Sequence, residues 1–362
     1  MASTPYASDR DSATEARPFI IWTLRRTGGT NLAQHVFRRS RFRSIQHEPF
    51  NKNRVFGKVS ADFERDGDTA PLDRICADGI LMKHCVETVP LALSLALLER
   101  SVAHGYRHLF LIRRTPGDRL VSLHFAGASG VWGARMVAQN SIDNLSRIAR
   151  NTPIPIDGLL ARERLDRARL LAVYERADAL ETRPLIAVFE DLYDYDAPSL
   201  SLARLARLTA GLGLDRAGDA ADGADREILF GGGQKTQSLY ALAPNHDAFR
   251  KAVSEIPPMT LGAVPDPNPA QWANFVTHLG CRIDPPRQSW RSDLLQLTGT
   301  TAPRDGWRLR LADGTVLPME TEVARSPDAS KPAISFAVLD VPRDGLAGAR
   351  MVMRQPSSGP SQ

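Results

Sequence analysis

The chain has 362 residues, of which 43% are hydrophobic and 24% are charged. These values are ordinary for globular proteins, and they exclude a fibrous or wholly disordered chain. Three cysteines are too few for a disulfide framework and are not spaced as a zinc knuckle needs, so we expect a reducing compartment, the cytoplasm. No apolar run is long enough to span a bilayer, and the acidic N-terminal residues lack an apolar core, so we expect no signal peptide.

Positive charge is concentrated near the N-terminus. The net charge is +5, yet residues Arg17 to Lys58 contain ten Lys or Arg residues and a single acid, Glu48. Such an excess attracts a nucleic acid, an anionic membrane surface or a phosphorylated small ligand, or it is a solvated basic face. The charge pattern by itself does not choose among these.

Strand-like and helix-like patterns alternate over the first two thirds of the chain. Continuous apolar runs are typical of strands buried on both faces, and apolar residues at helical spacing lie between them. The predicted strands are 19–24, 80–82, 108–112 and 185–189, and the predicted helices are 31–39, 87–103, 118–127, 157–180 and 200–212. This alternation predicts an α/β fold, with a central parallel sheet flanked by helices.

The pattern changes near residue 299. Short alternating segments at 307–311, 315–322 and 334–341, with an Asp313-Gly314 turn, predict antiparallel strands. We therefore expect a main domain at 17–298 and a small β-rich C-terminal extension at 299–355. The polar ends, 1–16 and 356–362, are expected to be disordered tails.

The first motif is a glycine loop, Thr23–Leu32 (TLRRTGGTNL), between the first strand and helix. The N–H groups of a helix N-terminus favour an anion in the preceding loop, and Gly28 and Gly29 let the backbone approach a phosphate. Cationic and hydroxyl side chains flank the glycines: Arg25, Arg26, Thr27 and Thr30. The alternative is an ordinary tight turn. The loop lacks the G-x-x-x-x-G-K-S/T pattern, which disfavours a nucleoside triphosphate with magnesium.

The second motif, Phe110–Ala126 (FLIRRTPGDRLVSLHFA), again places a turn between a strand and a helix. Arg113 and Arg114 end the strand, and Ser122 lies in the helix, three residues after Arg119. Arg114 and Ser122 together are candidates to hold a second anion. The alternative is a solvent-facing arginine pair with a serine in a helix groove.

Together the two motifs resemble those of sulfotransferases that use 3′-phosphoadenosine 5′-phosphosulfate. That family carries a K/R-S/T-G-x-T loop after its first strand and an R-x-P-x-D-x-x-V-S motif later. Residues 26–30 (RTGGT) fit the first, and residues 114–122 (RTPGDRLVS) fit the second. The segments 48–51 (EPFN) and 231–236 (GGGQKT) are similar to further family segments. The resemblance covers about residues 16–290, and 299–355 has no counterpart.

The resemblance implies a P-loop-like sulfotransferase architecture and an enzyme of the bacterial type. It would move a sulfuryl group to a hydroxyl, less readily an amine, of a carbohydrate or another small-molecule or glycan acceptor. It implies no metal, no nucleic acid partner and no membrane span, and it leaves a homo-oligomer open. Two alternatives keep the fold but change the function: a non-catalytic nucleotide- or glycan-binding module, and a small-molecule kinase.

The resemblance also assigns the donor site. The 5′-phosphosulfate would lie on the glycine loop and the 3′-phosphate on the second motif, with Lys235 on a loop that closes over the nucleotide. The expected donor ligands are Arg25, Arg26, Thr27, Gly28, Gly29, Thr30, Asn31, Arg114, Arg119, Ser122 and Lys235. Arg26 stands where many relatives have lysine. An arginine keeps its charge, so it can stabilise the leaving phosphate but cannot give up a proton.

Sulfuryl transfer needs an aligned acceptor oxygen and a base that takes its proton. Glu48 resembles the glutamate proposed as base in bacterial and heparan-type relatives, and its alternative is a structural Glu–Arg pair. Lys83 is the expected stabiliser of charge on the sulfuryl group, with Arg26 on the leaving group. His84 is the second candidate for the base.

Overall fold

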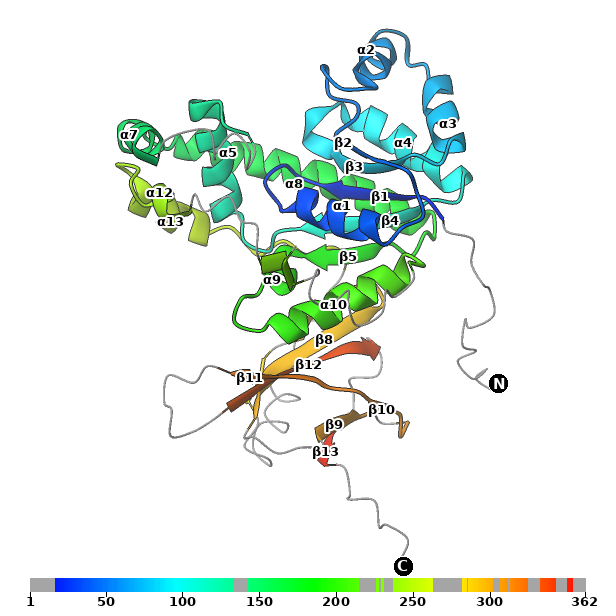
Figure 1. The fold of residues 1–362 in the computed structure, drawn as a ribbon, viewed down its shortest axis with the longest axis vertical. Helices are drawn as coiled ribbons and strands as arrows, with labels where there is room; N and C mark the ends of the chain where they lie inside the picture. Colours follow the sequence, from blue (N-terminus) through cyan, green and yellow to red (C-terminus); the bar gives the residue numbers. More distant parts are fainter. Residues whose placement is uncertain are drawn as a thin grey trace, which may run out of the picture.

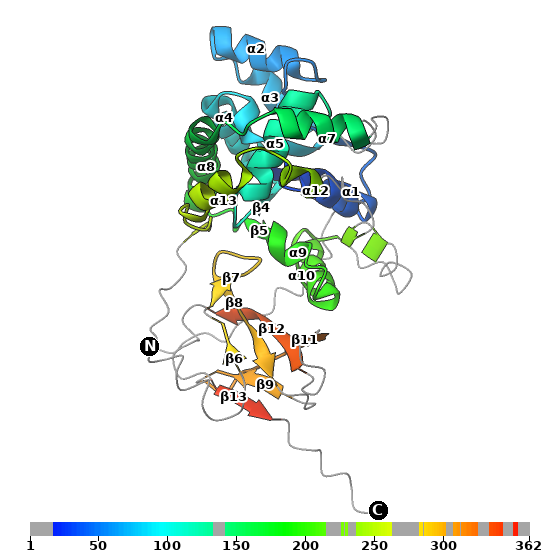
Figure 2. The same cartoon turned by 90° about the vertical axis from the view of Figure 1, so that its left-hand side faces the viewer.

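The structure is a computed structural model. It describes residues 17–132, 142–214, 226–227, 229–230, 237–262, 282–284, 286–301, 307–311, 313–324, 333–342 and 350–353. Helices cover a parallel sheet, and antiparallel strands continue the chain on one side of this body (Figures 1 and 2). The two polar tails and Lys235 lie outside the described residues.

Among the described residues, the central sheet has five parallel strands in the order β2-β3-β1-β4-β5. The strands are β1 (Phe19–Thr23), β2 (Ile45–His47), β3 (Leu81–Cys85), β4 (Arg107–Ile112) and β5 (Leu185–Val188). All residues of β1, β3 and β5 are buried, as expected for parallel strands covered on both faces. The expected α/β fold is confirmed.

Helices cover both faces of this sheet (Figure 1). α4 and α8 pack on one face, and α1 and α10 pack on the other. The helical elements are α1 (Gly29–Arg38), α2 (Gly57–Asp66), α3 (Ala70–Ala77), η1 (Val86–Thr88), α4 (Leu91–Ala103), α5 (Gly117–Ser129), α7 (Ile142–Asn151), α8 (Ile156–Ala179), α9 (Phe189–Leu192), α10 (Pro198–Gly211), α12 (Gln237–Tyr240) and α13 (His246–Ser254). In the part of the chain that is described, none of them is long and apolar enough to cross a membrane.

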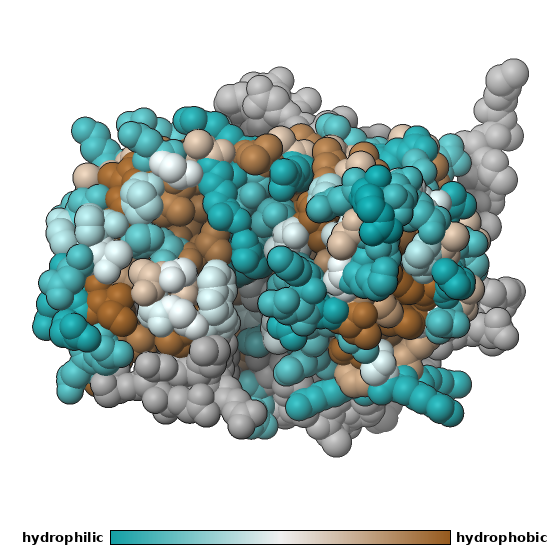
Figure 3. Space-filling model, turned by 90° about the horizontal axis from the view of Figure 1, so that it is seen from above, coloured by the Kyte–Doolittle hydropathy of each residue, from teal (hydrophilic) through white to brown (hydrophobic). Residues whose placement is uncertain are grey.

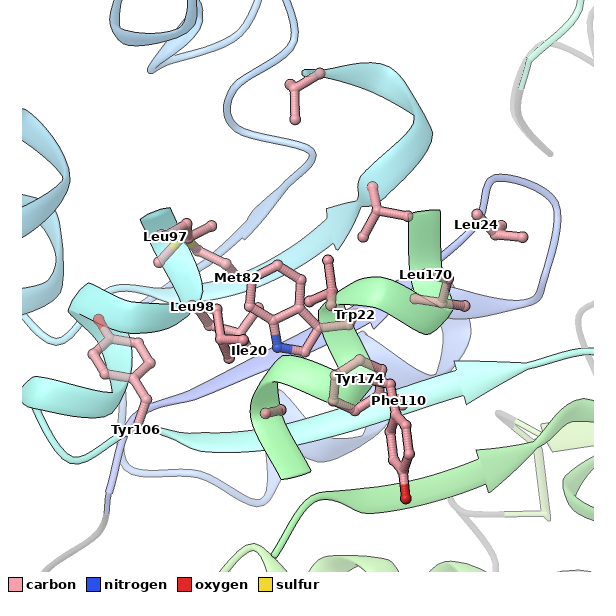
Figure 4. Packing of buried hydrophobic residues seen from close by; sticks show 14 of the residues in the cluster. Ile20, Trp22, Leu24, Met82, Leu97, Leu98, Tyr106, Phe110, Leu170 and Tyr174 are labelled. Carbon is pink, nitrogen blue, oxygen red and sulfur yellow. The ribbon is translucent and has the colours of Figure 1, made fainter. Parts of the chain in front are cut away.

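Trp22 of β1 anchors the core beneath α4 and α8 (Figure 4). Its ring stacks on Phe110 at 6.2 Å, and Tyr174 meets Phe110 edge-on at 5.3 Å. The indole N–H donates to His108 Nδ1 at 3.1 Å. Burial lowers the pKa of His108 to about 3, so its ring is neutral and accepts this bond. The contacts fix β1 against β4, the strands that carry the two sequence motifs.

Some predicted boundaries were wrong. The helix expected at 87–103 begins at Leu91, because Pro90 precedes it in an extended conformation and Val86–Thr88 forms a separate 3₁₀ turn. β2 was missed because it is a short, half-buried edge strand without an apolar run. The antiparallel strands begin before residue 299, which lies inside β8.

The antiparallel strands form two small sheets among the described residues, ordered β11-β12-β8-β6, with β7 on β8, and β10-β9-β13. They are β6 (Arg282–Ile283), β7 (Arg287–Gln288), β8 (Leu294–Thr301), β9 (Trp307–Arg310), β10 (Val316–Leu317), β11 (Glu320–Ala324), β12 (Ala333–Pro342) and β13 (Arg350–Met353). Both views place β8 and β12 beside α10 (Figures 1 and 2).

The antiparallel strands are attached to the α/β body by polar and apolar contacts. Arg207 of α10 pairs with Asp340 at 3.0 Å and with Glu320 at 3.3 Å. Ile186 N donates to Trp290 O at 2.8 Å, which joins β5 to the segment before β8. A small apolar cluster, Ala197, Leu200, Ala337 and Leu339, lies in the same interface. The C-terminal strands therefore pack on α10.

Candidate functional site

The glycine loop lies at the carboxyl end of the central sheet, between β1 and α1. After β1 the chain continues to β2, which lies on one side of β1 in the sheet. After β4 it continues to β5, which lies on the other side. Ligands of open parallel sheets bind where neighbouring connections diverge in this way. Viewed from above, the molecule is hollowed between its α5–α7 side and its α2–α4 side, with hydrophilic residues along the hollow (Figure 3).

Both the backbone conformation at position 28 and the neighbouring side chains require a glycine there. Its φ is +81°, in the left-handed region, and it caps α1. A Cβ on this residue would lie 2.7 Å from the Phe189 ring and 3.2 Å from that of Tyr193. The Tyr193 hydroxyl donates to the Gly28 carbonyl at 3.2 Å. The segment after β5 therefore packs directly on the loop.

We expect Gly28→Ala to destabilise the protein by about 2–4 kcal/mol, because left-handed strain and overpacking against Phe189 add together. Gly67→Ala is the matched control, since its φ is +69° but a Cβ there would meet nothing within 4 Å. It should cost only the strain, about 1–2 kcal/mol. Urea unfolding of both variants measures the difference. Equal losses of stability in the two variants would mean that the Phe189 ring moves away from the added Cβ at no cost in free energy.

A buried ionic cluster holds the start of the loop. The Arg25 backbone N–H donates to Glu87 Oε1 at 2.6 Å, and Arg119 Nη1 donates to the Arg25 carbonyl at 3.4 Å. Arg119 also pairs with Glu163 and, at 3.1 Å, with Asp166, and its side chain is only 1% exposed. The expectation from the sequence was that Arg119 contacts the donor; in the structure two carboxylates and the Arg25 carbonyl engage its guanidinium.

Arg26 links the two sequence motifs. Its Nε donates to Ser122 Oγ at 2.7 Å, and it contacts the Tyr240 hydroxyl. Burial lowers the pKa of Arg26, and Tyr240 partly offsets this; an arginine remains charged at neutral pH. Its φ of 66° is unusual for a residue with a side chain.

The two arginines that end β4 have different surroundings. Arg114 Nη2 donates to both carboxylate oxygens of Asp191 at 2.9 Å, and Gln296 of β8 donates to the same carboxylate at 2.6 Å. The guanidinium of Arg113 lies 3.8 Å above the Phe189 ring, beside Gly28, and its buried Nε has no hydrogen-bond partner among the described residues. The structure thus places Arg114 on Asp191 and Ser122 on Arg26, and does not join them as expected.

Glu48 and Lys83 form an ion pair beneath the glycine loop. Lys83 Nζ lies 2.5 Å from Glu48 Oε1, and Asn51 Nδ2 donates to Glu48 Oε2 at 2.9 Å. A Cβ on Gly29 would lie 3.1 Å from Lys83 Cδ, so the lysine stem passes under the loop. Glu48 therefore pairs with Lys83, another residue that the sequence predicted for the site. The structural alternative had paired Glu48 with an arginine. Glu48 also has a positive φ, 51°.

Both members of this pair are charged at neutral pH. Burial raises the pKa of the Glu48 carboxyl, but the charge of Lys83 and hydrogen bonds from Lys83, Cys85 and Asn51 bring it below the usual 4.5. Burial lowers the pKa of Lys83, and its neighbours Cys85 and Glu48 raise it above the usual 10.5. Glu48 can therefore accept a proton, and Lys83 can stabilise an anion.

His84 lies on the opposite face of the sheet, because successive residues of a strand alternate. Its ring packs edge-on against Trp22 at 5.2 Å, and its Nε2 lies 3.0 Å from Ser94 Oγ. Burial lowers the pKa of His84 to about 4. The structure thus buries the ring of this second candidate for the base in the apolar core, on the face of β3 opposite the Lys83 side chain.

The other loop residues differ in exposure. The Thr27 side chain is buried, and its hydroxyl has no hydrogen-bond partner within the described residues. Thr30 is exposed, and Asn31 is half-buried near the start of α1. A buried hydroxyl of the glycine loop that has no partner is suited to donate to a ligand oxygen.

Three further residues shape this site and were not given a role from the sequence. Glu87 fixes the Arg25 backbone, Tyr240 contacts Arg26, and Arg113 lies over Phe189. Arg113 could have been considered because it adjoins Arg114 at the end of a strand. Tyr240 follows the segment 231–236, which resembles the family's loop that closes over the nucleotide, and the fold brings it to Arg26. No group of three or more His, Cys, Asp or Glu suited to a metal occurs among the described residues.

No family model and no curated protein matches the chain. Among solved structures, it is similar to a chain from a structural study of the PezAT chromosomal toxin–antitoxin system of the human pathogen Streptococcus pneumoniae. The identity is 13%, and the match covers 68% of this chain and 92% of that chain, with a TM-score of 0.27. A likeness this distant supports no statement about function.

Proposed function

We propose that this protein is a sulfotransferase that uses 3′-phosphoadenosine 5′-phosphosulfate. The observation that carries the proposal is the 2.7 Å hydrogen bond from Arg26 to Ser122, two residues 96 positions apart. It puts the loop assigned to the phosphosulfate next to the helix assigned to the 3′-phosphate. A donor with phosphates on the 3′ and 5′ carbons of one ribose needs two anion sites on neighbouring segments of the protein.

The residues present suit an in-line transfer. The acceptor oxygen attacks sulfur, the bond from sulfur to the phosphate oxygen breaks, and adenosine 3′,5′-bisphosphate leaves. The acceptor proton passes to the ionised Glu48 carboxylate, and Lys83 and Arg26 stabilise charge on the sulfuryl and leaving oxygens. The Glu48–Lys83 bond must loosen for this, because both carboxylate oxygens of Glu48 have partners.

The hydrogen bonds of Glu48 to Lys83 and Asn51 also favour a second candidate function, a nucleotide-binding module on the same fold that transfers no group. In that case the Lys83–Glu48–Asn51 contacts are structural and stay closed. Both candidates bind the bisphosphate, so only turnover separates them. The kinase alternative differs from both, because it needs a triphosphate and magnesium.

Titration calorimetry with adenosine 3′,5′-bisphosphate and with ATP, in EDTA, tests the class of ligand. We expect micromolar affinity for the bisphosphate and at least tenfold weaker binding of ATP. ATP lacks the 3′-phosphate and so loses one charge-assisted contact, and a tenfold change in affinity corresponds to only about 1.4 kcal/mol. Tighter binding of ATP would refute the proposal.

A pair of neighbouring variants tests the donor site. We expect Arg113→Met to lower affinity for the bisphosphate about tenfold or more, because a charge-assisted hydrogen bond is worth about 1.5–3 kcal/mol and Arg113 Nε has no hydrogen-bond partner among the described residues. Arg114→Met should lower it less, because Asp191 already engages that side chain. A larger loss in the Arg114 variant would restore the role expected from the sequence and show that Asp191 releases Arg114 to the ligand.

A further inference from the structure

A buried polar network joins the antiparallel strands to the second sequence motif. Gln296 of β8 is 2% exposed, and its side-chain amide donates to Asp191 Oδ2 at 2.6 Å. Both oxygens of that carboxylate accept from Arg114 Nη2 at 2.9 Å. A single carboxylate therefore connects a C-terminal strand to the arginine that the sequence assigned to the 3′-phosphate.

The neighbours of Gln296 fix the orientation of its amide. Arg204 of α10 can only donate, and its Nε lies 3.2 Å from Gln296 Oε1. The amide NH₂ group therefore faces two acceptors, the Asp191 carboxylate and, at 3.1 Å, the Gln288 carbonyl. Arg204 also donates to the backbone carbonyl of Asp191 at 3.0 Å. Gln296 and Arg204 together hold Asp191 by its carboxylate and by its backbone.

A second series of hydrogen bonds reaches Arg114 through its backbone. The Arg114 carbonyl accepts from Met259 N at 2.9 Å. Two residues later, Leu261 N donates to Oε1 of the buried Gln288 at 3.0 Å. Gln288 belongs to β7, which pairs with β8. The antiparallel strands are therefore connected to Arg114 at both its side chain and its main chain.

We propose that the antiparallel strands complete the donor site, with Gln296 as a positioning residue for Arg114. The inference rests on the proposed function. Among the described residues only Nη2 of the Arg114 side chain has a hydrogen-bond partner, and the side chain is 23% exposed, so Nε and Nη1 remain available to a 3′-phosphate. Side chains that bind a ligand are held in productive geometry by a surrounding layer of hydrogen bonds. Gln296, which supplies that layer here, lies outside residues 16–290, the part of the chain that resembles sulfotransferases.

The ratio of the affinities for adenosine 3′,5′-bisphosphate and adenosine 5′-phosphate isolates the contact with the 3′-phosphate. We expect Gln296→Met to lower this ratio about threefold or more, a change of the size that substitutions in a coupled network produce without touching the ligand. The affinity for adenosine 5′-phosphate should stay that of the parent. Arg207→Met is the matched control, because it removes the pairs with Asp340 and Glu320 in the same interface and leaves Asp191 untouched. Its ratio should equal that of the parent.

A double variant distinguishes positioning from general loosening of the interface. Arg114→Met should lower the ratio by itself, and Gln296→Met added to it should have no further effect, because Gln296 acts through Arg114. A further loss in the double variant would overturn the inference. So would an unchanged or raised ratio in Gln296→Met, or the parental ratio in Arg114→Met.

Binding of adenosine 5′-phosphate shows that each variant is folded. If Gln296→Met does not bind it, Gln288→Met decides the inference by the same ratio, because it removes the side-chain acceptor of Leu261 N. A parent that prefers the bisphosphate, with variants of the same preference, refutes this inference and leaves the proposed function standing. A parent without that preference refutes the proposed donor site, and the inference with it.

Discussion

Glu48→Gln should lower the rate of sulfuryl transfer by about 100-fold or more, with little change in bisphosphate affinity. General-base assistance is typically worth about 10²–10⁴-fold, and glutamine keeps the shape of the side chain without its basicity. The structure supports this choice because Glu48 is ionised at neutral pH and adjoins the glycine loop through Lys83. Turnover and bisphosphate affinity measured on one preparation give both quantities.

The same variant should also be less stable, by about 1.5–3 kcal/mol at neutral pH, because it weakens a charged hydrogen bond to the buried Lys83. The pKa of folded Glu48 lies below the usual 4.5. Its contribution to stability is therefore complete above about pH 4.5 and is lost as the pH falls through the folded pKa. The difference in unfolding free energy between the parent and the variant should therefore be smaller in acid than at pH 7. Urea unfolding at the two pH values measures it.

Glu181→Gln is the control for this prediction. Glu181 also has a positive φ, 54°, but it precedes β5 at the other end of the sheet and is exposed. We expect its turnover and stability to match the parent. If Glu48→Gln is stable, binds the bisphosphate and turns over within a few-fold of the parent, Glu48 is not the base. The burial of His84 would then require a base outside the sequence candidates.

Arg119→Met should destabilise the protein by about 3–5 kcal/mol. It leaves the buried Glu163 with Arg167 and the buried Asp166 with Arg162 as their remaining cations, and removing one member of a buried ionic network is costly. It also removes the donor to the Arg25 carbonyl, so bisphosphate affinity should fall through loosening of the loop. Urea unfolding and bisphosphate titration measure the two effects.

Arg176→Met is the matched control, because Arg176 pairs with Glu99 at the surface of α8 and both side chains are nearly half exposed. Exposed pairs contribute about 0–1 kcal/mol. The triple variant Arg119→Met, Glu163→Gln, Asp166→Asn should recover part of the lost stability, because the two buried carboxylate charges are removed together with Arg119, and Arg162 and Arg167, which lose their partners, are less buried. A fully stable Arg119→Met that fails to bind the bisphosphate would return Arg119 to the donor site.

Local sequence determined the sheet and the glycine loop. A strand covered on both faces needs an unbroken apolar run, so β1, β4 and β5 could be predicted without knowledge of their neighbours. Gly28 could likewise be singled out, because a left-handed turn into a helix favours glycine. The short edge strand β2 carries no comparable signal, since it is only half-buried.

Only the tertiary structure decided which polar residues share the site. Arg119 and Ser122 lie three residues apart on one helix, yet Arg119 is buried against carboxylates 44 and 47 residues later, whereas Ser122 contacts Arg26. Lys83 and His84 are adjacent, but the alternation of β3 sends one to Glu48 and the other into the core. Partners this far apart in sequence leave no local pattern, because burial and pairing arise only when the elements pack.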